Sequence, residues 1–330
     1  MPFAFDEFNA LASSIPPQSS RNDAKLWYAA SMVAELCYYH VPKFEIDSRK
    51  RAKVIPCDAY QQILLTGLPT DVVNHLQAAD FVRIFVITDR GVIAIGIQIG
   101  TRLFVGFRGT VFLYDWRINL RVPLISLDSG FVFRPGSVHS VGTGRFHRGF
   151  SEEAVRMAVR IWQELEKKTQ NQIDEVILCG HSLGGAIAAI CEPMLWGAGD
   201  RVRTVLLGSP RYCDAAALYG RPGNFPIQIK RWGDMVPSIP PRSLGYADCP
   251  WEFNTSGEPV FESMRSSKLK HFLWYWTLFI NKRFEPHNVE GYRRELGTAC
   301  GAKGSELLLD AAKLSRSGYP KGDYESERGN

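Results

Sequence analysis

The chain has 330 residues, 45% of them hydrophobic and 22% charged, which is the composition of an ordinary globular protein with one large or two ordinary domains. Its net charge of +5 is small and scattered along the sequence, so no nucleic-acid partner is predicted. The first residues lack the features of a secretory signal, and no apolar run is as long as a transmembrane helix.

The seven cysteines are dispersed, odd in number and without a C-x-x-C pair. This pattern favours a reducing compartment, so we expect a cytoplasmic protein, with export by a signal-independent route as the alternative. Cys179 and Cys191 lie in apolar segments and are interpreted as packing residues.

An N-terminal helical segment, residues 1–80, is expected to pack on the domain that follows it. Residues 1–24 are rich in Pro and Ser and are predicted to lie on the surface. Apolar residues in 25–40 recur with helical spacing until Pro42 ends the helix. Residues 43–80 indicate irregular chain with one or two short helices.

The pattern changes to β-rich sequence at residue 81. Residues 81–88 and 92–99 are separated by a turn signal and predict a hairpin, and 103–107 predict a third strand. A long loop is expected at 121–146, followed by a helix at 151–168 with an N-cap-like start.

Strands and helices then alternate, which predicts an α/β fold with a mixed, mostly parallel sheet flanked by helices on both faces. We expect this domain to span 81–300 and to be followed by a polar, partly disordered tail at 301–330. The remaining expected elements are a strand and helix at 176–190, strands at 202–207 and 226–232, a loop at 238–258, an apolar helical segment at 269–280 and a helix at 288–296.

Residues 180–184 (GHSLG) form a G-x-S-x-G motif between an apolar strand and a helix of small residues. This context is typical of a nucleophile elbow, a strained turn that lifts the serine hydroxyl above the sheet edge. Ser182 is therefore the predicted nucleophile. The amide of Leu183 opens the helix and is predicted to face a developing oxyanion. A structural turn without catalysis is the alternative.

A serine nucleophile needs a basic histidine, which follows it in the chain of elbow hydrolases. The histidines after Ser182 are His271 and His287. We favour His287 because it lies at a loop-to-helix transition, whereas His271 lies within a basic, amphipathic segment.

The histidine in turn needs a carboxylate. Asp234 directly follows an apolar strand, where α/β enzymes present reactive groups, so we favour it over Asp214 and Asp248. No Cys/His set has zinc spacing and there is no glycine-rich phosphate loop, so neither a metal nor a cofactor is predicted.

Several short motifs occur in order between residues 100 and 295: 105–110 (VGFRGT), 115–116 (DW) with 119–120 (NL), 147–150 (HRGF), 180–185 (GHSLGG), 208–211 (GSPR), 234–237 (DMVP) and 287–288 (HN) with Tyr292. In this order they resemble the lipase class 3 family, which comprises the fungal-type triacylglycerol lipases and their plant and bacterial relatives. The secreted fungal members carry signal peptides and disulfides, and this chain shows neither signature.

The resemblance implies an α/β-hydrolase fold with Ser182 as nucleophile, Asp234 as orienting acid and His287 as base. It also implies that Thr110 supplies a second oxyanion donor, through its amide and hydroxyl, beside the amide of Leu183.

The resemblance further implies a mobile lid at about 111–120. The candidate lid residues are Tyr114, Trp116 and Leu120, with Trp116 as an apolar plug. The segment 269–280 fits either a lipid-facing rim or a core helix, since both have the same periodicity.

The predicted function is hydrolysis of lipid esters through an acyl-enzyme, with a lipid or ester as substrate and contact with a lipid–water interface. The alternatives are a phospholipase, a short-chain esterase, a toxin acting on foreign membranes, or an inactive protein of the same fold that binds a membrane or partner.

Overall fold

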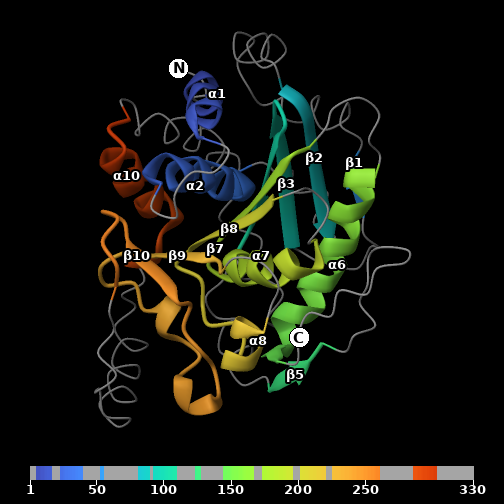
Figure 1. The fold of residues 1–330 in the computed structure, drawn as a ribbon, viewed down its shortest axis with the longest axis vertical. Coiled ribbons are helices and arrows are strands. Elements are labelled where there is room, and N and C mark those ends of the chain that lie inside the picture. Colours follow the sequence, from blue (N-terminus) through green and yellow to red (C-terminus); the bar gives the residue numbers. More distant parts are fainter. Residues whose placement is uncertain are drawn as a thin grey trace, which may run out of the picture.

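A mixed β-sheet runs through the middle of the computed structural model (Figure 1). The structure describes residues 5–16, 23–39, 53–55, 81–89, 92–109, 123–127, 144–166, 173–195, 201–220, 225–260 and 285–302. Within them the sheet has eight strands, in the order β1-β2-β3-β4-β7-β8-β9-β10. The strands are β1 (Lys53–Ile55), β2 (Phe81–Asp89), β3 (Val92–Ile99), β4 (Arg102–Phe107), β7 (Glu175–His181), β8 (Arg201–Leu207), β9 (Ile227–Lys230) and β10 (Trp251–Asn254).

The two halves of the sheet differ in strand direction. Strands β1 to β4 pair antiparallel, and β4, β7, β8, β9 and β10 pair parallel. The predicted hairpin is therefore confirmed as β2 and β3, and the mostly parallel remainder is confirmed as well. Because the parallel strands end at one edge, the turns that follow them can build a common site there.

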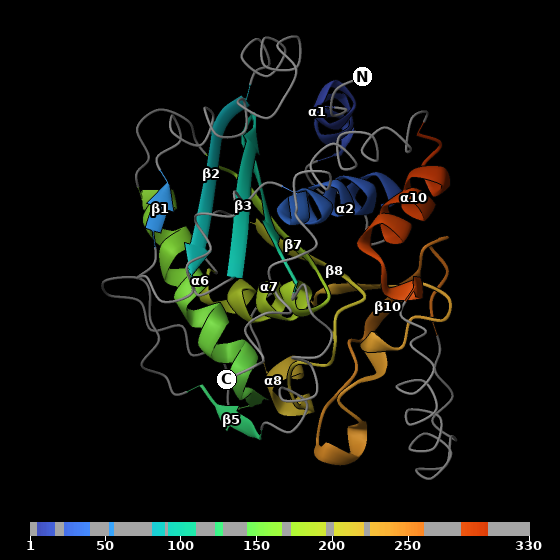
Figure 2. The ribbon, with the colours of Figure 1, turned by 180° about the vertical axis from the view of Figure 1, so that it is seen from behind.

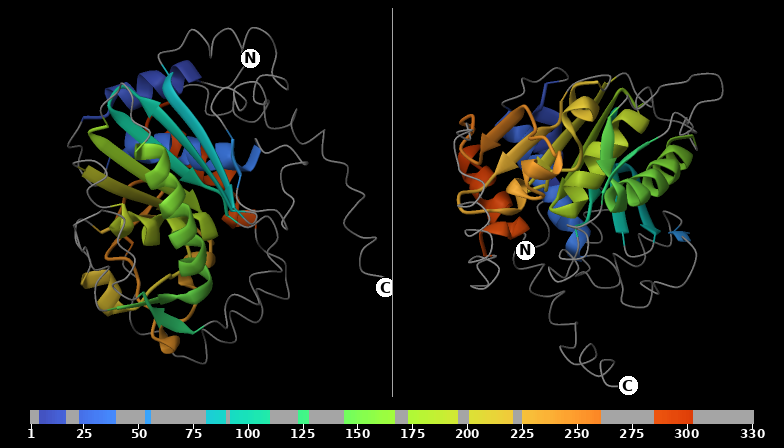
Figure 3. Two further views of the ribbon diagram at one scale, coloured as in Figure 1. Left: turned by 90° about the vertical axis from the view of Figure 1, so that its right-hand side faces the viewer. Right: turned by 90° about the horizontal axis from the view of Figure 1, so that it is seen from below.

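Helices cover both faces of the sheet (Figures 2 and 3). Helices α1, α2 and α10 lie on one face, and α6 and α7 on the other, which is the layering predicted from the sequence. The α-helices are α1 (Phe5–Ser14), α2 (Ala24–Tyr39), α6 (Arg148–Glu166), α7 (Leu183–Met194), α8 (Ala215–Tyr219) and α10 (Val289–Ala299). Short 3-10 helices are η3 (Val236–Ser238), η4 (Arg242–Leu244) and η5 (Glu285–His287), and β5 (Leu124–Ser126) pairs with β6 (Arg145–His147).

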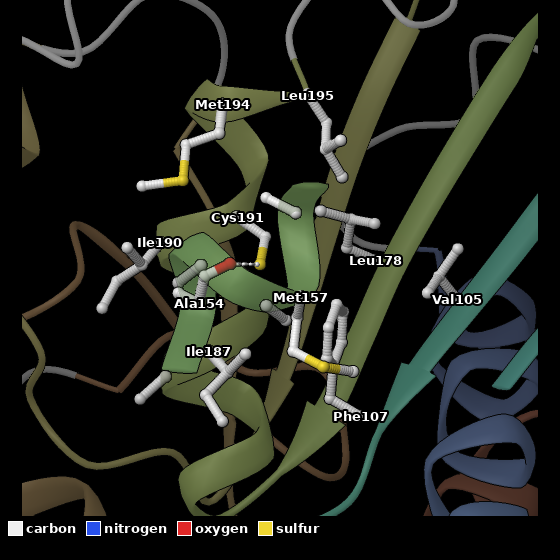
Figure 4. Packing of buried hydrophobic residues seen from close by; sticks show 14 of the residues in the cluster. Val105, Phe107, Ala154, Met157, Leu178, Ile187, Ile190, Cys191, Met194 and Leu195 are labelled. Atoms are coloured by element: carbon white, nitrogen blue, oxygen red, sulfur yellow. Dashed lines mark hydrogen bonds between the residues drawn. The ribbon is translucent and has the colours of Figure 1, made fainter. Parts of the chain in front are cut away.

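The face under α6 and α7 holds one apolar core, in which Phe107, Met157 and Ile187 are packed together (Figure 4). The thiol of Cys191 donates a hydrogen bond to the carbonyl oxygen of Ala154, 3.2 Å away, and so joins α7 to α6. Burial raises the pKa of the Cys191 thiol. The predicted packing role of this cysteine is confirmed.

The opposite face is covered by α2, whose residues 26–37 are all buried. The prediction that residues 1–24 lie on the surface is wrong for α1, where Phe8 and Ala12 are buried with Ile15 just beyond. Their spacing puts them on one side of a helix, and Phe8 packs edge-on against Phe104. The apolar spacing within this segment outweighs its Pro- and Ser-rich composition.

Short strands lie where irregular chain was predicted. Strand β1 falls within 43–80, β5 falls within 121–146, β6 begins at the end of that range, and β10 falls within 238–258. Each has three or four residues, which is too short for an alternating pattern to be recognised. These parts of the prediction are wrong.

Helix α6 begins at Arg148 rather than at the predicted Ser151. The Ser151 hydroxyl donates to the carbonyl oxygen of His147 at 2.9 Å, a bond made within a helix, so Ser151 is not an N-cap. The predicted apolar segment 269–280 and the tail from 303 lie outside the described residues, and the domain boundaries stay predictions. No helix in the described part has the length and apolarity needed to cross a bilayer.

An ion pair buried between α2 and α10 joins the two helices that flank this face. The Arg293 guanidinium pairs with the Glu35 carboxylate, and both side chains are completely buried. Two charges removed from water need each other, because the loss of either partner leaves an uncompensated charge in the interior. This pair joins α10 to α2, and His287 lies two residues before the first residue of α10.

We predict that Glu35→Gln lowers the free energy of unfolding by about 3–5 kcal/mol, because it leaves Arg293 charged and buried. Denaturant unfolding measures this. Glu152→Gln is the matched control: its pair with Arg148 has side chains that are 54% and 59% exposed, so its loss costs at most about 1 kcal/mol. Equal effects of the two changes would contradict the prediction.

Candidate active site

Ser182 lies in a strained turn between β7 and α7. Its φ of 60° and ψ of −130° make it the one non-glycine residue with positive φ in the described part of the chain. Its amide donates to the carbonyl oxygen of Leu207 at 3.0 Å, which fixes the turn to the neighbouring strand β8. A non-glycine residue held in this conformation is typical of a nucleophile elbow.

The glycines around Ser182 are required by close packing. A Cβ atom on Gly180 would lie 2.3 Å from the carbonyl carbon of Gly184. A Cβ on Gly184 would lie 2.2 Å from the carbonyl oxygen of Phe107 on β4. The strand, turn and helix therefore approach so closely that both positions exclude any larger side chain, as the G-x-S-x-G context predicts.

Asp234 and His287 form a hydrogen-bonded pair. His287 Nδ1 lies 2.9 Å from Asp234 Oδ2, and the Asp234 side chain is completely buried. The other oxygen, Oδ1, accepts a hydrogen bond from the amide of Val236 at 2.9 Å. His287 Nε2 is buried and has no hydrogen-bond partner among the described residues. A histidine held in this way offers Nε2 to a nucleophile or leaving group.

Tyr292 supplies a further donor to the same carboxylate. Its hydroxyl donates to Asp234 Oδ2 and accepts from the amide of Arg231 at 3.1 Å. Burial, together with the negative charge of Asp234, raises the pKa of Tyr292, so the hydroxyl keeps its proton. The Arg231 guanidinium also donates to the carbonyl oxygen of Pro286 at 2.8 Å, which ties the turn after β9 to the residue before His287.

The alternatives weighed from the sequence have other partners. Asp214 is the N-cap of α8 and accepts from the amide of Ala217 at 2.9 Å. Asp248 pairs with Arg211 and Arg242. Neither carboxylate contacts His287 in the described structure, so the geometry selects Asp234. His271 lies outside the described residues.

The chain leaving β4 passes beside the elbow. A Cβ atom on Gly109 would lie 2.6 Å from the carbonyl oxygen of His181 and 3.0 Å from the Cβ of Ser182. Thr110 follows directly but lies outside the described residues, as do the lid candidates Tyr114, Trp116 and Leu120. Leu183 is the first residue of α7. Their proposed roles as oxyanion donors and lid stay predictions.

Tyr38 belongs to the site although no local pattern marks it, and His181 lies within the GHSLG motif but has no role predicted from the sequence. The Tyr38 hydroxyl lies 2.8 Å from His181 Nδ1 and accepts from the amide of Gly109 at 3.2 Å. The His181 ring lies against the ring of His287, with their centroids 4.5 Å apart. Tyr38 lies in the last turn of α2, far earlier in the chain, so only the folded structure brings it here.

His181 is held in its neutral form. Burial lowers its pKa well below the usual 6.5, and the positive charges of His287 and Arg231 lower it further. The backbone of His287 acts in the opposite sense without reversing the shift. The site therefore contains two histidine rings in contact, of which one stays uncharged.

The comparisons with known proteins agree with the motifs. The family model described as lipase (class 3) matches residues 104–244, which include the elbow and Asp234 but not His287. A secreted mono- and diacylglycerol lipase 1 of Fusarium solani is 26% identical over 171 residues, which are 51% of this chain and 48% of that protein. Phospholipase A1-II 7 of Oryza sativa subsp. indica is 26% identical over 221 residues, 57% of this chain and 52% of its own.

The chain thus spans about half the length of the curated relatives it matches. Among solved structures, the Rhizomucor miehei lipase propeptide complex aligns with a TM-score of 0.46 and 18% identity over 72% of this chain and 69% of its own. Lipase II from Rhizopus niveus aligns with a TM-score of 0.45 and 17% identity over 76% and 82%. The match of residues 104–244 to the lipase (class 3) model confirms the predicted resemblance to that family.

The lowered pKa of His181 predicts a loss of stability in acid. Below about pH 6.5 His181 binds a proton in the unfolded chain but stays unprotonated in the folded state, so the free energy of unfolding falls as pH falls. We expect the unfolding free energy of the wild type to decrease more steeply from pH 7 to pH 5 than that of His181→Asn, by up to about 1.4 kcal/mol per pH unit. Denaturant unfolding at several pH values measures the two slopes, and parallel slopes would contradict the prediction.

Proposed function

We propose that this protein is a serine hydrolase of lipid esters. The observation that carries the proposal is the buried Asp234–His287 hydrogen bond, which lies at the sheet edge that also bears Ser182 in its strained elbow. The match of residues 104–244 to the lipase (class 3) model supports the same class of reaction. Ser182, Asp234 and His287 would act as nucleophile, orienting acid and base.

The reaction begins when Ser182 Oγ attacks the ester carbonyl carbon and His287 Nε2 takes the hydroxyl proton. Asp234 holds the Nδ1–H of His287 and stabilises the imidazolium that forms. The amides of Leu183 and Thr110 would hold the tetrahedral oxyanion. Collapse releases the alcohol, protonated by His287, and leaves an acyl-enzyme. Water, deprotonated by His287, then releases the acid and restores Ser182.

The substrate class follows from the two relatives named above, since one is called a mono- and diacylglycerol lipase and the other a phospholipase A1. Both names describe enzymes that cleave carboxylic esters of glycerolipids. We therefore propose an acylglycerol ester as the substrate, with a phospholipid or a short-chain ester as the alternatives. A cytoplasmic location, expected from the dispersed cysteines, is likewise a proposal.

Contact with a lipid surface is part of the proposal, and Trp232 favours it. This side chain is 97% exposed and lies two residues before Asp234. The side chain of its neighbour Arg231 donates hydrogen bonds to the Glu295 carboxylate and to the carbonyl oxygen of Pro286, which join this turn to η5 and α10. Tryptophan favours the boundary between lipid and water, where its apolar ring is buried and its N–H stays hydrated.

The first test uses a series of chromogenic esters of increasing acyl length. We expect the wild type to hydrolyse them and Ser182→Ala to lose this activity. Asp234→Asn should lower kcat by about 10⁴-fold, because it leaves His287 in the wrong tautomer. The chain-length profile distinguishes a lipase from a short-chain esterase, and a headgroup panel distinguishes a phospholipase.

Asp214→Asn is the matched control, since this aspartate caps α8 and does not contact His287. It should leave kcat within about threefold when activity is expressed per folded molecule. Retention of activity in Ser182→Ala would contradict the proposed nucleophile. A folded wild type inactive on every ester, with and without vesicles, would favour the alternative of an inactive binding protein.

The interface proposal predicts that Trp232→Ser lowers the rate on phospholipid or triglyceride dispersions by about tenfold while hydrolysis of a water-soluble ester stays unchanged. Tyr219→Ser removes another exposed aromatic side chain, which is 64% exposed on α8, and should change neither rate. Vesicle sedimentation measures binding directly. Equal sedimentation of wild type and Trp232→Ser would contradict a role for Trp232.

A further inference from the structure

We propose that Tyr38 and His181 are positioning residues that hold the oxyanion side of the site and the segment of the catalytic base in one fixed arrangement. The inference rests on the proposed hydrolase function and extends it to residues outside the Ser-Asp-His set. Tyr38 comes from α2, His181 from the end of β7, and the groups that they connect come from the turn after β4 and from the end of η5.

The order of protons in this network follows from its hydrogen bonds. The amide of Gly109 can only donate, so the Tyr38 oxygen accepts that bond at 3.2 Å. The Tyr38 hydroxyl keeps its proton and donates a hydrogen bond to His181 Nδ1, 2.8 Å away. Nδ1 of His181 is therefore the acceptor, and the neutral ring carries its proton on Nε2.

His181 connects this network to the base. Its ring lies 4.5 Å from the His287 ring and 5.7 Å from the Tyr292 ring, centroid to centroid. Its Nε2, which carries the proton, is buried and has no hydrogen-bond partner of normal geometry within the described residues. The backbone of His287 nevertheless lies close enough to affect the pKa of the His181 ring. Tyr38 thus holds the Nδ1 edge of the His181 ring, and the ring itself packs against the ring of His287.

The Tyr38 hydroxyl also fixes the backbone beside Ser182. A Cβ atom on Gly109 would lie 2.5 Å from the Tyr38 oxygen and 3.0 Å from the Ser182 Cβ, so the chain passes through a narrow space between them. The amide of Gly109 is held at this point, one residue before the proposed oxyanion donor Thr110. An oxyanion donor contributes to catalysis only if its direction is set before the charge develops.

Helix α2, which carries Tyr38, is joined to α10 by a buried ion pair. The buried Glu35–Arg293 pair joins α2 to α10, and Glu35 lies one turn before Tyr38 on the same helix. Tyr38 therefore reaches the elbow from a helix that is fixed to the element carrying Tyr292. Through the contacts of Tyr38, helix α2 forms part of the active site as well as covering one face of the sheet.

The test is Tyr38→Phe, which keeps the ring and removes only the hydroxyl. We expect kcat on a water-soluble ester to fall about ten- to hundredfold with little change in KM, because the transition state loses support and the bound substrate does not. The second-order rate of phosphonylation of Ser182 by a nitrophenyl phosphonate, which forms a tetrahedral adduct, should fall by the same factor. His181→Asn should match Tyr38→Phe, and the double variant should fall no further than the larger single effect.

Two measurements do not depend on turnover. The nitrogen chemical shifts of His181 should show a neutral ring with its proton on Nε2 in the wild type. Hydrogen exchange at the Gly109 amide should become at least about tenfold faster in Tyr38→Phe, because the amide loses its acceptor. Tyr28→Phe makes the same change at a buried tyrosine of α2 and should leave all these values unchanged.

An active wild type with full kcat in Tyr38→Phe would overturn this inference and leave the proposed function intact. A proton on Nδ1 of His181, or unchanged exchange at Gly109, would overturn the network itself. An inactive wild type would overturn the proposed function and with it the catalytic part of this inference. Equal losses in Tyr38→Phe and Tyr28→Phe would reduce the role of Tyr38 to general packing of α2.

Discussion

The buried carboxylate of Asp234 is the constraint around which this site is built. A carboxylate without water is stable only if donors and an opposite charge replace its hydration. Here the donors are the ring of His287, the hydroxyl of Tyr292 and the amide of Val236, from three separate segments. Satisfying one charge therefore fixes the turn after β9, the end of η5 and the first turns of α10 together.

The fixed position of α10 depends in turn on the N-terminal part of the chain. Arg293, in the helix that carries Tyr292, is neutralised by Glu35 of α2, and the pair is completely buried. Buried ion pairs contribute little net stability compared with apolar packing, but they penalise every arrangement that separates the two charges. The pair thus specifies the relative position of α2 and α10, from which Tyr38 and Tyr292 reach the site.

What the sequence could predict was determined by how local each signal is. The elbow is marked by consecutive residues that have a steric reason, so Ser182 and its glycines were found, and chain order together with strand ends led to Asp234 and His287. Tyr38 is joined to the site only by tertiary contacts. The helical spacing of apolar residues in α2 does not show which end of the helix approaches Gly109. Short edge strands such as β10 were missed because three or four residues carry no recognisable alternation.

The contact between the rings of His181 and His287 shows how burial at this point would favour the proposed reaction. In the proposed reaction, proton transfer from Ser182 would place a positive charge on His287, whose ring centroid lies 4.5 Å from that of His181. Two unit charges at about 4 Å repel by about 4 kcal/mol at an effective dielectric constant of 20, which would oppose that transfer. The environment lowers the pKa of His181, so this neighbour stays neutral while the base becomes charged. The same burial that costs stability in acid would therefore remove a barrier at the proposed proton-transfer step, and the hydroxyl of Tyr38, 2.8 Å from His181 Nδ1, would leave the proton of the neutral ring on Nε2.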